Sequence, residues 1–364
     1  MAHRRNNRPR DVRCVERAAV PAGAWGLREI QRQGGSVVIE ILSNGAPNVV
    51  QDLGRYGCLS YGVSRSGAMD PFALSIGNAL VGNERGEAGI EINLFPFRVK
   101  FHQDIRFAVT GADAKTTLDN QRLAPWWGRS ASAGQTLVIE RPRRGARAYL
   151  TFGGGINVKP IMGSKSTDLK GAFGGASGRG LMRGDRLDVG SEHSRSARPW
   201  KVGLGVVPPG LLDYWDELST NCVTVRVLPA AEFDRFTPRS LAAFLQDEFK
   251  VSPDANRVGY RLIGPALIQS VPVELLSHGI VAGTIQVPPS GQAIVQLAEA
   301  NTCGGYPKIA TVIEADLWKL SQAPIGCNVR FELTDIDTAV TALRTRRDEE
   351  LRIRDTLAMM SGRA

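Results

Sequence analysis

The sequence predicts a mostly β fold with a few helices, arranged in two strand-rich units. Short apolar runs recur between turn signals, and 40 glycines and 20 prolines among the 364 residues supply many turns. A polar, proline-containing segment separates two stretches of similar texture. We therefore expect five parts: a basic flexible tail (1–35), a first β unit (36–190), a linker (191–222), a second β unit (223–340) and a basic C-terminal tail (341–364).

Apolar runs bounded by turn residues predict the strands of the first unit. They are residues 37–42, 88–94, 97–101, 105–110, 115–118, 136–140 and 146–152. One helix is expected over 69–83, where Asp70 can cap the first turn and Gly82 can end the last. The polar, glycine-rich segment 162–185 predicts an ordered functional loop or a flap.

The second unit repeats this pattern of many strands and few helices. Its expected strands are residues 223–228, 260–263, 284–287 and 329–333. Its expected helices are residues 239–249, 310–321 and 335–347. We expect the chain beyond the last helix to be frayed, because that segment shows no apolar periodicity.

The net charge of +9 lies mainly in the two ends of the chain. Residues 1–35 carry eight arginines against three acidic residues, and residues 340–364 carry six against four. The body is therefore nearly neutral, which argues against a nucleic-acid-binding protein with a basic stripe on its folded part. No apolar run approaches the roughly 18 residues that a membrane span requires.

Motifs that announce a bound metal or cofactor are missing from the sequence. The five cysteines are scattered and only four histidines occur, so no metal-ligand spacing is present. The sequence also lacks a P-loop, a GxSxG elbow, an HExxH pair and a strand-linked GxGxxG. We expect no metal and no cofactor bound by this chain itself, and reduced thiols in a cytoplasmic protein.

Four polar clusters set among glycines are the candidates for chemistry. They are residues 51–55, residues 64–70, residues 164–167, and Gln286 with 299–306. Each has a structural alternative: an Asp52–Arg55 pair, a helix cap at Asp70, a solvated loop at 164–167, and a hairpin with a glycine turn over 283–307. Together they suit a site for an amide or a carboxylate, built from backbone N–H groups, amides and a few charges.

Five sequence blocks resemble the biotin-dependent carboxyltransferase family. The family includes allophanate hydrolase subunit 2, the carboxyltransferase half of urea carboxylase, and the C subunit of 5-oxoprolinase. The blocks are QDLGRYG, GVSRSGAMDPFALSIGNALVGN, FGGGINVKPIMGSKST, GTIQVPPSGQ and GGYPKIATVIEADLWKLSQ. They keep the family's order over about residues 37–340. The resemblance implies two cyclophilin-like β-barrel subdomains and a site formed with a second, related subunit.

The resemblance also implies an activity that needs partner subunits. The first expectation is an ATP-dependent complex, with a further lactam-hydrolase subunit, that opens 5-oxoproline to glutamate. The alternatives are carboxyl transfer from carboxybiotin to urea or another amide, and a regulatory antagonist without turnover. ATP or carboxybiotin would reach the site through the partners.

In either reaction an amide oxygen gains negative charge, so hydrogen-bond donors and a base are required. The catalytic candidates are Gln286, Glu299, Tyr306 and Asp70. The substrate-binding candidates are Arg55, Arg65, Ser66, Lys165, Thr167, Asn301, Gly304 and Gly305. We expect Gln286 to face a cleft, because alternation turns it away from Ile285 and Val287. Glu299 is expected at the mouth of a strand.

Two segments depart from the family pattern. In GVSRSGAMD, Ser64 and Arg65 replace two prolines, and AEANTCGGYP carries Glu299 where the family has an aspartate. A glutamate keeps the charge but moves it by roughly one methylene, which a substrate-binding carboxylate would feel. The resemblance therefore leaves the substrate open.

The N-terminal tail generates the first testable prediction. Residues 1–35 show no apolar periodicity and are too polar to offset their ordering entropy by burial. Deleting them should leave the thermal unfolding midpoint, measured by circular dichroism, nearly unchanged. A drop of many degrees would mean that Trp25 and Leu27 dock on the body.

Overall fold

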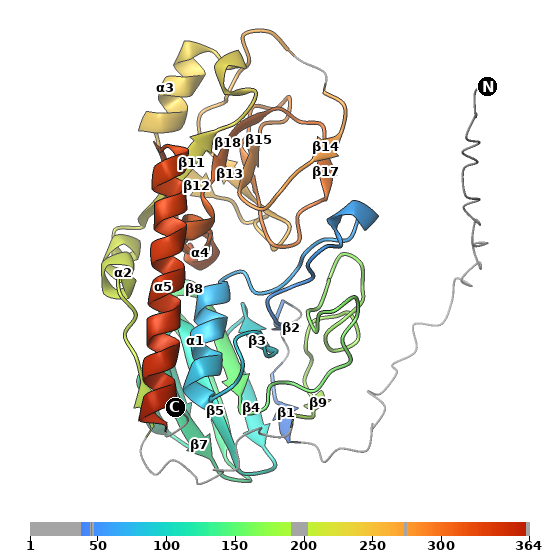
Figure 1. Cartoon of the computed structure of the whole chain (residues 1–364), viewed down its shortest axis with the longest axis vertical. Coiled ribbons are helices and arrows are strands. Elements are labelled where there is room, and N and C mark those ends of the chain that lie inside the picture. The colour runs from blue at the N-terminus through green and yellow to red at the C-terminus, as the bar shows by residue number, and fades with distance from the viewer. Residues whose placement is uncertain (1–37, 44, 46, 191–202, 273–274, 362–364) are drawn as a thin grey trace, which may run out of the picture.

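Two β-rich units follow one another along the long axis of the molecule, and a long helix runs beside both (Figure 1). The computed structural model describes residues 38–361 apart from 44, 46, 191–202 and 273–274, so the predictions for residues 1–35 lie outside the described part. The predicted mostly β fold with a few helices is confirmed. Within the described residues, no helix has the length and apolar character needed to cross a membrane.

The first unit is one ten-stranded sheet. Its strands are β1 (Ile39–Ile41), β2 (Val49–Gln51), β3 (Gly89–Ile92), β4 (Phe97–Phe101), β5 (Ile105–Leu118), β6 (Gln121–Leu123), β7 (Trp127–Ala131), β8 (Thr136–Phe152), β9 (Arg186–Leu187) and β10 (Leu204–Gly205). The main path runs β10-β7-β5-β8-β4-β1-β9, with β3 also on β8, β2 on β3, and β6 on β5. Buried aromatic rings of Phe101, Phe107 and Phe152 contact one another in its core.

Two long antiparallel strands, β5 and β8, form the backbone of this sheet. They pair from Phe107 opposite Phe152 to Leu118 opposite Leu137, with irregular register between Gly111 and Thr116. Each was expected as two separate runs. In β8 the dividing residues 141–145 are mostly polar and partly exposed, whereas in β5 the division at 111–114 includes buried Ala112 and Ala114 and coincides with the irregular register.

The second unit is a closed seven-stranded barrel in the order β11-β18-β15-β16-β13-β12-β19. Its strands are β11 (Cys222–Pro229), β12 (Phe249–Val251), β13 (Gly259–Ile263), β15 (Thr284–Gln286), β16 (Ile294–Gln296), β18 (Lys308–Val312) and β19 (Asn328–Leu333). A two-stranded ribbon of β14 (His278–Gly279) and β17 (Cys303–Gly304) lies beside it. Helix α3 (Pro238–Gln246) covers β19, with Phe244 stacked on Phe331 at 4.6 Å.

Helix α1 (Pro71–Val81) confirms the helix expected over 69–83. Asp70 caps it by accepting from the Ala73 N–H at 3.0 Å, and Pro71 occupies the first turn. Gly82 ends it with a φ of 81°, a left-handed conformation that suits glycine. Ten of its residues are buried, because β5 and β8 cover one side and the C-terminal helix another.

Three predictions about helices are wrong. The linker contains helix α2 (Leu211–Ser219), whose Tyr214 and Trp215 are buried. Within 310–321, residues up to Val312 are strand β18, and only α4 (Leu317–Gln322) is α-helical. Short 3-10 turns occur at η1 (Leu59–Tyr61), η2 (Phe233–Arg235) and η3 (Glu314–Asp316).

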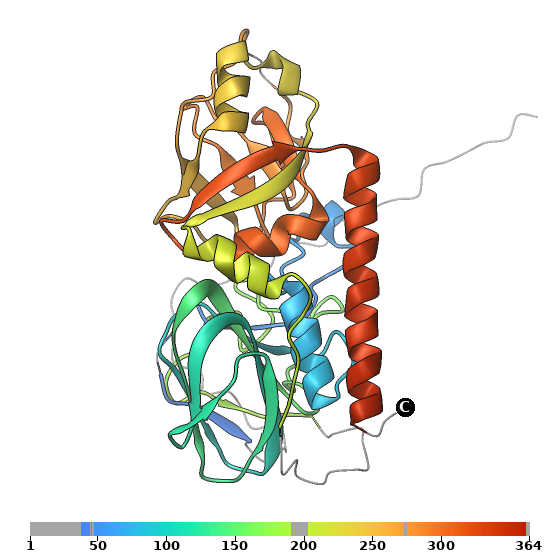
Figure 2. The same ribbon diagram turned by 90° about the vertical axis from the view of Figure 1, so that its left-hand side faces the viewer.

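The third correction concerns the predicted tail at 341–364. Helix α5 (Ile336–Met360) extends through it and packs against α1 and η3, so it touches both units (Figure 2). The inner face of α5 mixes apolar and charged residues, since Leu357 and Ile353 join the core while Glu350 and Arg354 lie between and beside them, so the apolar periodicity is interrupted. Glu350 is buried, accepts from Ser75 Oγ, and forms an ion pair with Arg85.

The buried carboxylate on α5 gives a stability prediction. Glu350→Ala should lower the free energy of unfolding by about 2 kcal/mol, because it leaves Ser75 and Arg85 without their acceptor. Asp348→Ala, on the exposed side of the same helix, should change it by less than about 0.5 kcal/mol. Urea titrations of both variants measure the difference. Equal effects would show that Glu350 does not anchor the helix.

Candidate functional site

The two units meet around a buried arginine. Arg257, in the loop before β13, donates from Nη1 to Glu91 of β3 at 2.5 Å and from Nε to Glu299 at 2.7 Å. Its Nη2 donates to the Gly67 carbonyl at 2.6 Å, so the side chain joins the barrel to the first sheet and to the loop before α1. All three charged groups are at most 6% exposed. We call Glu91, Arg257 and Glu299 the boundary triad.

Glu91 is the better stabilised of the two carboxylates. It also accepts from the Met69 N–H at 2.8 Å and from the Tyr149 hydroxyl at 2.9 Å. Burial alone would raise the pKa of Glu91, but Arg257 and Arg147 outweigh burial and hold this pKa below its ordinary value. Arg147 adds a bond to Tyr260 of the barrel at 2.6 Å.

Glu299 has only Arg257 as a charged partner in the described residues. Burial raises the pKa of Glu299, and the shared guanidinium offsets this only in part. Glu299 does follow the end of β16 (Ile294–Gln296), as expected, but its side chain is 2% exposed and is closed off from solvent. It orients Arg257 within the barrel unit, and Arg257 in turn links that unit to Glu91 of the first sheet.

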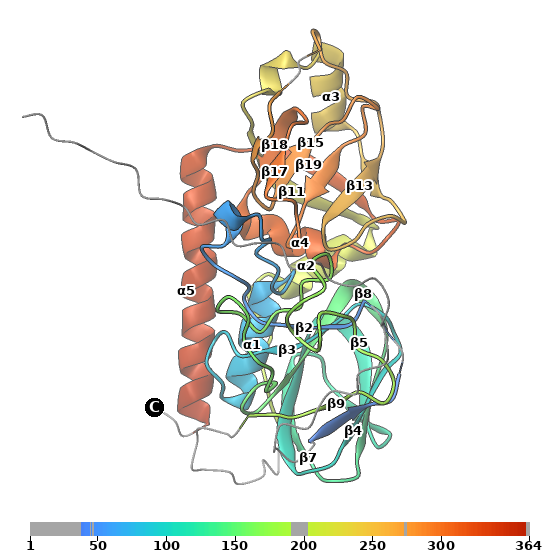
Figure 3. The same cartoon turned by 90° about the vertical axis from the view of Figure 1, so that its right-hand side faces the viewer.

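The first three predicted polar clusters form one network around Asp52. Asp52 accepts from Ser164 Oγ at 2.7 Å, Ser166 Oγ at 2.5 Å and the Lys165 N–H at 2.6 Å. The Ser64 hydroxyl belongs to the same network and donates to Asp168 at 2.7 Å. These hydrogen bonds hold the polar segment 162–185 against residues 51–55, which follow β2 of the first unit. Figure 3 shows these loops at the boundary between the units.

Arg55 is 1% exposed and belongs to the same network. Its guanidinium donates to the Ile161 carbonyl at 3.2 Å and to the Ser166 carbonyl, and it stacks on Phe173 at 4.6 Å. One nitrogen, Nη1, is buried and finds no acceptor among the described residues. Burial lowers the pKa of Arg55, which Asp168 and Asp52 partly counteract. The predicted Asp52–Arg55 ion pair does not form, because each binds the 161–168 loop instead.

Most other predicted binding residues also have internal partners. Arg65 stacks on Tyr56, with its guanidinium 4.2 Å from the ring centre, and Lys165 pairs with Glu87 at 3.0 Å. Thr167 Oγ1 donates to the Val50 carbonyl at 3.0 Å. Ser66 lies 3.3 Å from Ser64 through their hydroxyls.

Asp70 is a correction among the catalytic candidates. Its two oxygens accept from Ala73 N and from Gln322 Nε2, both at 3.0 Å, and it is 2% exposed. Burial raises the pKa of Asp70. Its contacts show the helix cap that the sequence offered as the alternative, together with a bond to Gln322 of α4.

Gln286 lies on β15 next to β16 and β18, and it keeps an unused donor. Its Oε1 accepts from Gln296 Nε2 at 2.9 Å, whereas its own Nε2 is buried and has no acceptor among the described residues. The predicted alternation of side chains along β15 is confirmed, since Ile285 and Val287 point into the core. However, Gln286 is only 4% exposed rather than open to a cleft. A Cβ at Gly304 would overlap the Gln286 amide, so glycine here allows the amide its present position.

Lys308 supplies a positive charge beside this amide. It is opposite Gln286 in the β15–β18 register and is 8% exposed. Its Nζ contacts His278 Nε2 and lies 3.9 Å from Glu232. His278 Nδ1 lies 2.9 Å from the Leu276 carbonyl, so the tautomer with a proton on Nδ1 leaves Nε2 to accept from Lys308.

We call Gln286, Gln296, Lys308, His278 and Gly304 the amide pocket. Tyr306 follows it and is 48% exposed, with no hydrogen bond from its hydroxyl to a described residue. Gly305 approaches the Leu275 carbonyl. Exposed Asn301 accepts from Lys170 of the 162–185 segment. The cluster at 286 and 299–306 therefore lies next to the segment that contains the cluster at 164–167. The structure thus brings all four clusters to one boundary.

Several residues that matter here were missed in the sequence. Glu91 interrupts an apolar strand, GIEI, and that break in pattern was a usable signal for a buried charge. Lys308 directly follows the GGYP turn. Arg257, Arg147 and Asp168 carry no local signal, because their partners lie far away in the sequence. No group of three or more His, Cys, Asp or Glu side chains suited to a metal occurs within the described residues.

A known protein family has a sequence model that matches most of this chain. The model "Carboxyltransferase domain, subdomain A and B" matches residues 61–333. The chain belongs to this family, as the five sequence blocks implied.

Individual relatives narrow the comparison. The chain is 41% identical over 313 residues to the C subunit of 5-oxoprolinase from Escherichia coli K12, covering 86% of this chain and 96% of that protein. It is 37% identical to the protein of the same name from Haemophilus influenzae, covering 84% and 94%. The solved urea amidolyase of K. lactis is 28% identical with a TM-score of 0.79, over 88% of this chain and 20% of that one.

The boundary triad predicts a pH-dependent stability. Glu91→Gln should lower the free energy of unfolding by about 3 kcal/mol at pH 7, because it leaves Arg257 short of a buried partner. The pKa of Glu91 is lowered on folding, so its contribution is present above its ordinary pKa and is lost as the pH falls through the folded pKa. The gap between variant and wild type should therefore shrink below about pH 4.5.

Urea titrations at several pH values measure this gap, and Glu314→Gln is the control. Glu314 is 61% exposed and its ion pair with Arg347 spans 3.9 Å. Its replacement should change stability by less than about 0.5 kcal/mol. A pH-independent gap for Glu91→Gln would contradict the assignment of a charged Glu91.

Proposed function

We propose that this chain is a subunit of an ATP-dependent complex that opens the lactam ring of 5-oxoproline to give glutamate. The proposal is supported by the two bacterial relatives that are named as C subunits of 5-oxoprolinase, which the chain covers almost completely. The complex acts in the cytoplasm. The four described cysteines are free thiols, which suits a reducing compartment.

The observation that carries the proposal is the unused Gln286 amide beside Lys308. Lactam opening places negative charge on the carbonyl oxygen in the transition state. Gln286 Nε2 lies beside Gly304, where a Cβ would overlap it, and it has no acceptor among the described residues. A carbonyl oxygen bound there would gain a hydrogen bond from Gln286 and attraction from the Lys308 charge. One such donor contributes about 3 kcal/mol of transition-state stabilisation.

The neighbours of Lys308 give it the means to move a proton. His278 accepts from Lys308 Nζ through Nε2, and Glu232 lies at 3.9 Å from the same nitrogen. Lys308 can therefore donate a proton toward a departing ring nitrogen while His278 and Glu232 stabilise its position. Exposed Tyr306, next to the pocket, is placed to contact substrate from the open side.

The chain needs partners for this reaction. We propose a second, related carboxyltransferase-type subunit that closes the amide pocket, and a third lactam-hydrolase subunit. ATP enters through these partners and is not bound by this chain. The boundary triad and the Asp52 network keep the loops beside the pocket in one arrangement, ready for the partner.

The second candidate is carboxyl transfer from carboxybiotin to urea or another amide. The structural likeness to the K. lactis urea amidolyase, with a TM-score of 0.79, favours it specifically. The same donors serve both reactions, since each develops charge on an amide oxygen. A regulatory antagonist without turnover would leave the amide pocket unused.

Partner identification and assay test the proposal. The full chain should co-purify with a related subunit and a lactam-hydrolase subunit, and the reconstituted set should convert 5-oxoproline to glutamate with ATP consumption. The chain alone should show no turnover. Urea carboxylation with a biotin carboxylase partner would favour the second candidate, and a kinase-inhibitor partner without turnover would favour the regulatory one.

The amide pocket gives a mutational prediction. In the reconstituted complex, Gln286→Ala and Lys308→Met should each lower turnover at least tenfold, equivalent to about 1.4 kcal/mol of transition-state stabilisation. Gln292→Ala, an exposed glutamine four residues before Gln296, should leave turnover unchanged. Steady-state kinetics on 5-oxoproline measure the effect, with melting curves to confirm folding. Full activity in both pocket variants would remove the pocket from the mechanism.

A further inference from the structure

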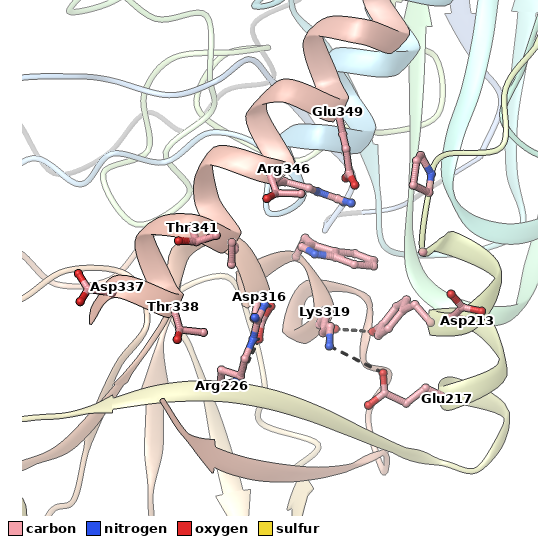
Figure 4. A pocket seen from close by; sticks show the side chains of 17 residues that line it. Asp213, Glu217, Arg226, Asp316, Lys319, Asp337, Thr338, Thr341, Arg346 and Glu349 are labelled. Carbon is pink, nitrogen blue, oxygen red and sulfur yellow. Dashed lines mark hydrogen bonds and ion pairs between the residues drawn. The ribbon is translucent and has the colours of Figure 1, made fainter. Parts of the chain in front are cut away.

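A cavity lies away from the amide pocket, among α2, α4, α5 and β11 (Figure 4). Its volume is about 760 Å³, enough for a small organic molecule. The α2 part was expected as linker and the α5 part as tail, and α5 falls outside the matched family region 61–333. The resemblance therefore assigns this cavity no role.

Arg346 is the unusual group in its wall. The guanidinium carbon stands 3.6 Å from the Phe72 ring centre and 4.5 Å from that of Trp318, so two aromatic rings hold it. It forms no hydrogen bond or ion pair with a described residue, and its Nε is buried without an acceptor. Burial lowers the pKa of Arg346, and the ordinary value is so high that the group stays charged. Its remaining donors can pair with an anion.

The other cations of the cavity are already neutralised. Arg226 binds Asp316 through two bonds of 2.9 and 2.7 Å. Lys319 Nζ donates to the Thr224 carbonyl at 3.1 Å and faces Glu217 at 4.0 Å. Arg346 is thus the cation with unused capacity among the described residues that line this cavity.

Carboxylates with unused capacity line the same cavity. Asp213 on α2, and Asp337 and Glu349 on α5, form no ion pair with a described residue. Figure 4 shows Glu349 beside Arg346, with Asp213 on the helix opposite. Glu349 lies one turn from Arg346 on the same helix yet does not pair with it. The cavity therefore offers one anion-binding group with cation-binding groups nearby.

An apolar floor lies between these charges. Tyr214 and Trp318 meet edge to face, with ring centres 4.5 Å apart, and the Tyr214 hydroxyl is already used on the Lys319 carbonyl at 2.6 Å. Such a surface accepts an aliphatic group. A plain anion would be repelled by the carboxylates, and a plain cation by Arg346. A zwitterion with an apolar side chain satisfies all three features.

We propose that this cavity binds a free α-amino acid with an apolar side chain. Its carboxylate would pair with Arg346, its ammonium group with Glu349 and Asp213, and its side chain would lie on Trp318 and Tyr214. The proposal does not depend on the proposed function, because the amide pocket shares none of these residues.

Calorimetric titration of the full chain tests it with three matched probes. L-Leucine carries both charged groups, 4-methylpentanoate lacks the ammonium group, and isoamylamine lacks the carboxylate. We expect L-leucine to bind with one site per chain, and each analogue to bind at least tenfold more weakly. Absence of saturable L-leucine binding overturns the proposal, as does equal binding of either analogue.

Variants locate the binding. Arg346→Gln should weaken L-leucine binding at least tenfold, and Glu349→Gln at least threefold. Arg347→Gln is the matched control, since Arg347 is the next residue on α5, is 62% exposed and does not line the cavity. Lys308→Met, in the amide pocket, should leave the affinity within twofold of wild type.

Two results would contradict this location. Unchanged affinity in both Arg346→Gln and Glu349→Gln rejects the cavity. Loss of binding in Lys308→Met with retention in Arg346→Gln places the ligand in the amide pocket and overturns the proposal, without bearing on the proposed turnover. If Arg346→Gln shows an altered melting curve, Glu349→Gln decides alone, because Glu349 forms no ion pair or side-chain hydrogen bond with a described residue that its replacement would break.

Discussion

One buried guanidinium, that of Arg257, connects the two halves of this protein. It is shared by a carboxylate from the first sheet and one from the second unit's own loop, and it also binds the backbone before α1. Removing three charged groups from water is costly, and the cost is recovered only when all hydrogen bonds form together. The units are therefore fixed in one orientation, which positions the Asp52 network against the amide pocket.

Local chemistry in the sequence explains the parts of the fold that were predicted correctly. Asp70, Pro71 and Gly82 delimit α1 through capping and a left-handed turn, which act over three or four residues. Strands such as Phe97–Phe101 follow from alternation alone. The first half of α5 was predicted as a helix over 335–347, but its continuation was missed, because Glu350 and Arg354 interrupt the apolar face formed by Ile353 and Leu357.

The sequence allowed us to predict which residues gather at the candidate site, but not what each of them does there. The polar clusters at 51–55, 164–167 and 286–306, which lie among glycines, do come together in the structure. Most of their side chains, however, form hydrogen bonds with one another instead of facing an open site. Asp70 and Glu299 show why. The sequence around a carboxylate in a polar segment does not distinguish a helix cap, an ion pair with arginine and a catalytic base. Among the predicted site residues, Gln286 and Arg55 keep a buried donor without an acceptor in the described part of the chain, and finding such a donor requires the full set of contacts.

The long separation between α5 and its contacts has a consequence for synthesis. Glu350 bonds to Ser75, which lies 275 residues earlier in the chain. A ribosome that has completed β19 has produced both β units, but the flank of α1 that includes Phe72 and Ser75 is still uncovered. Until α5 emerges, that flank lacks its covering helix, so α1 reaches its final burial only after both units have been synthesised.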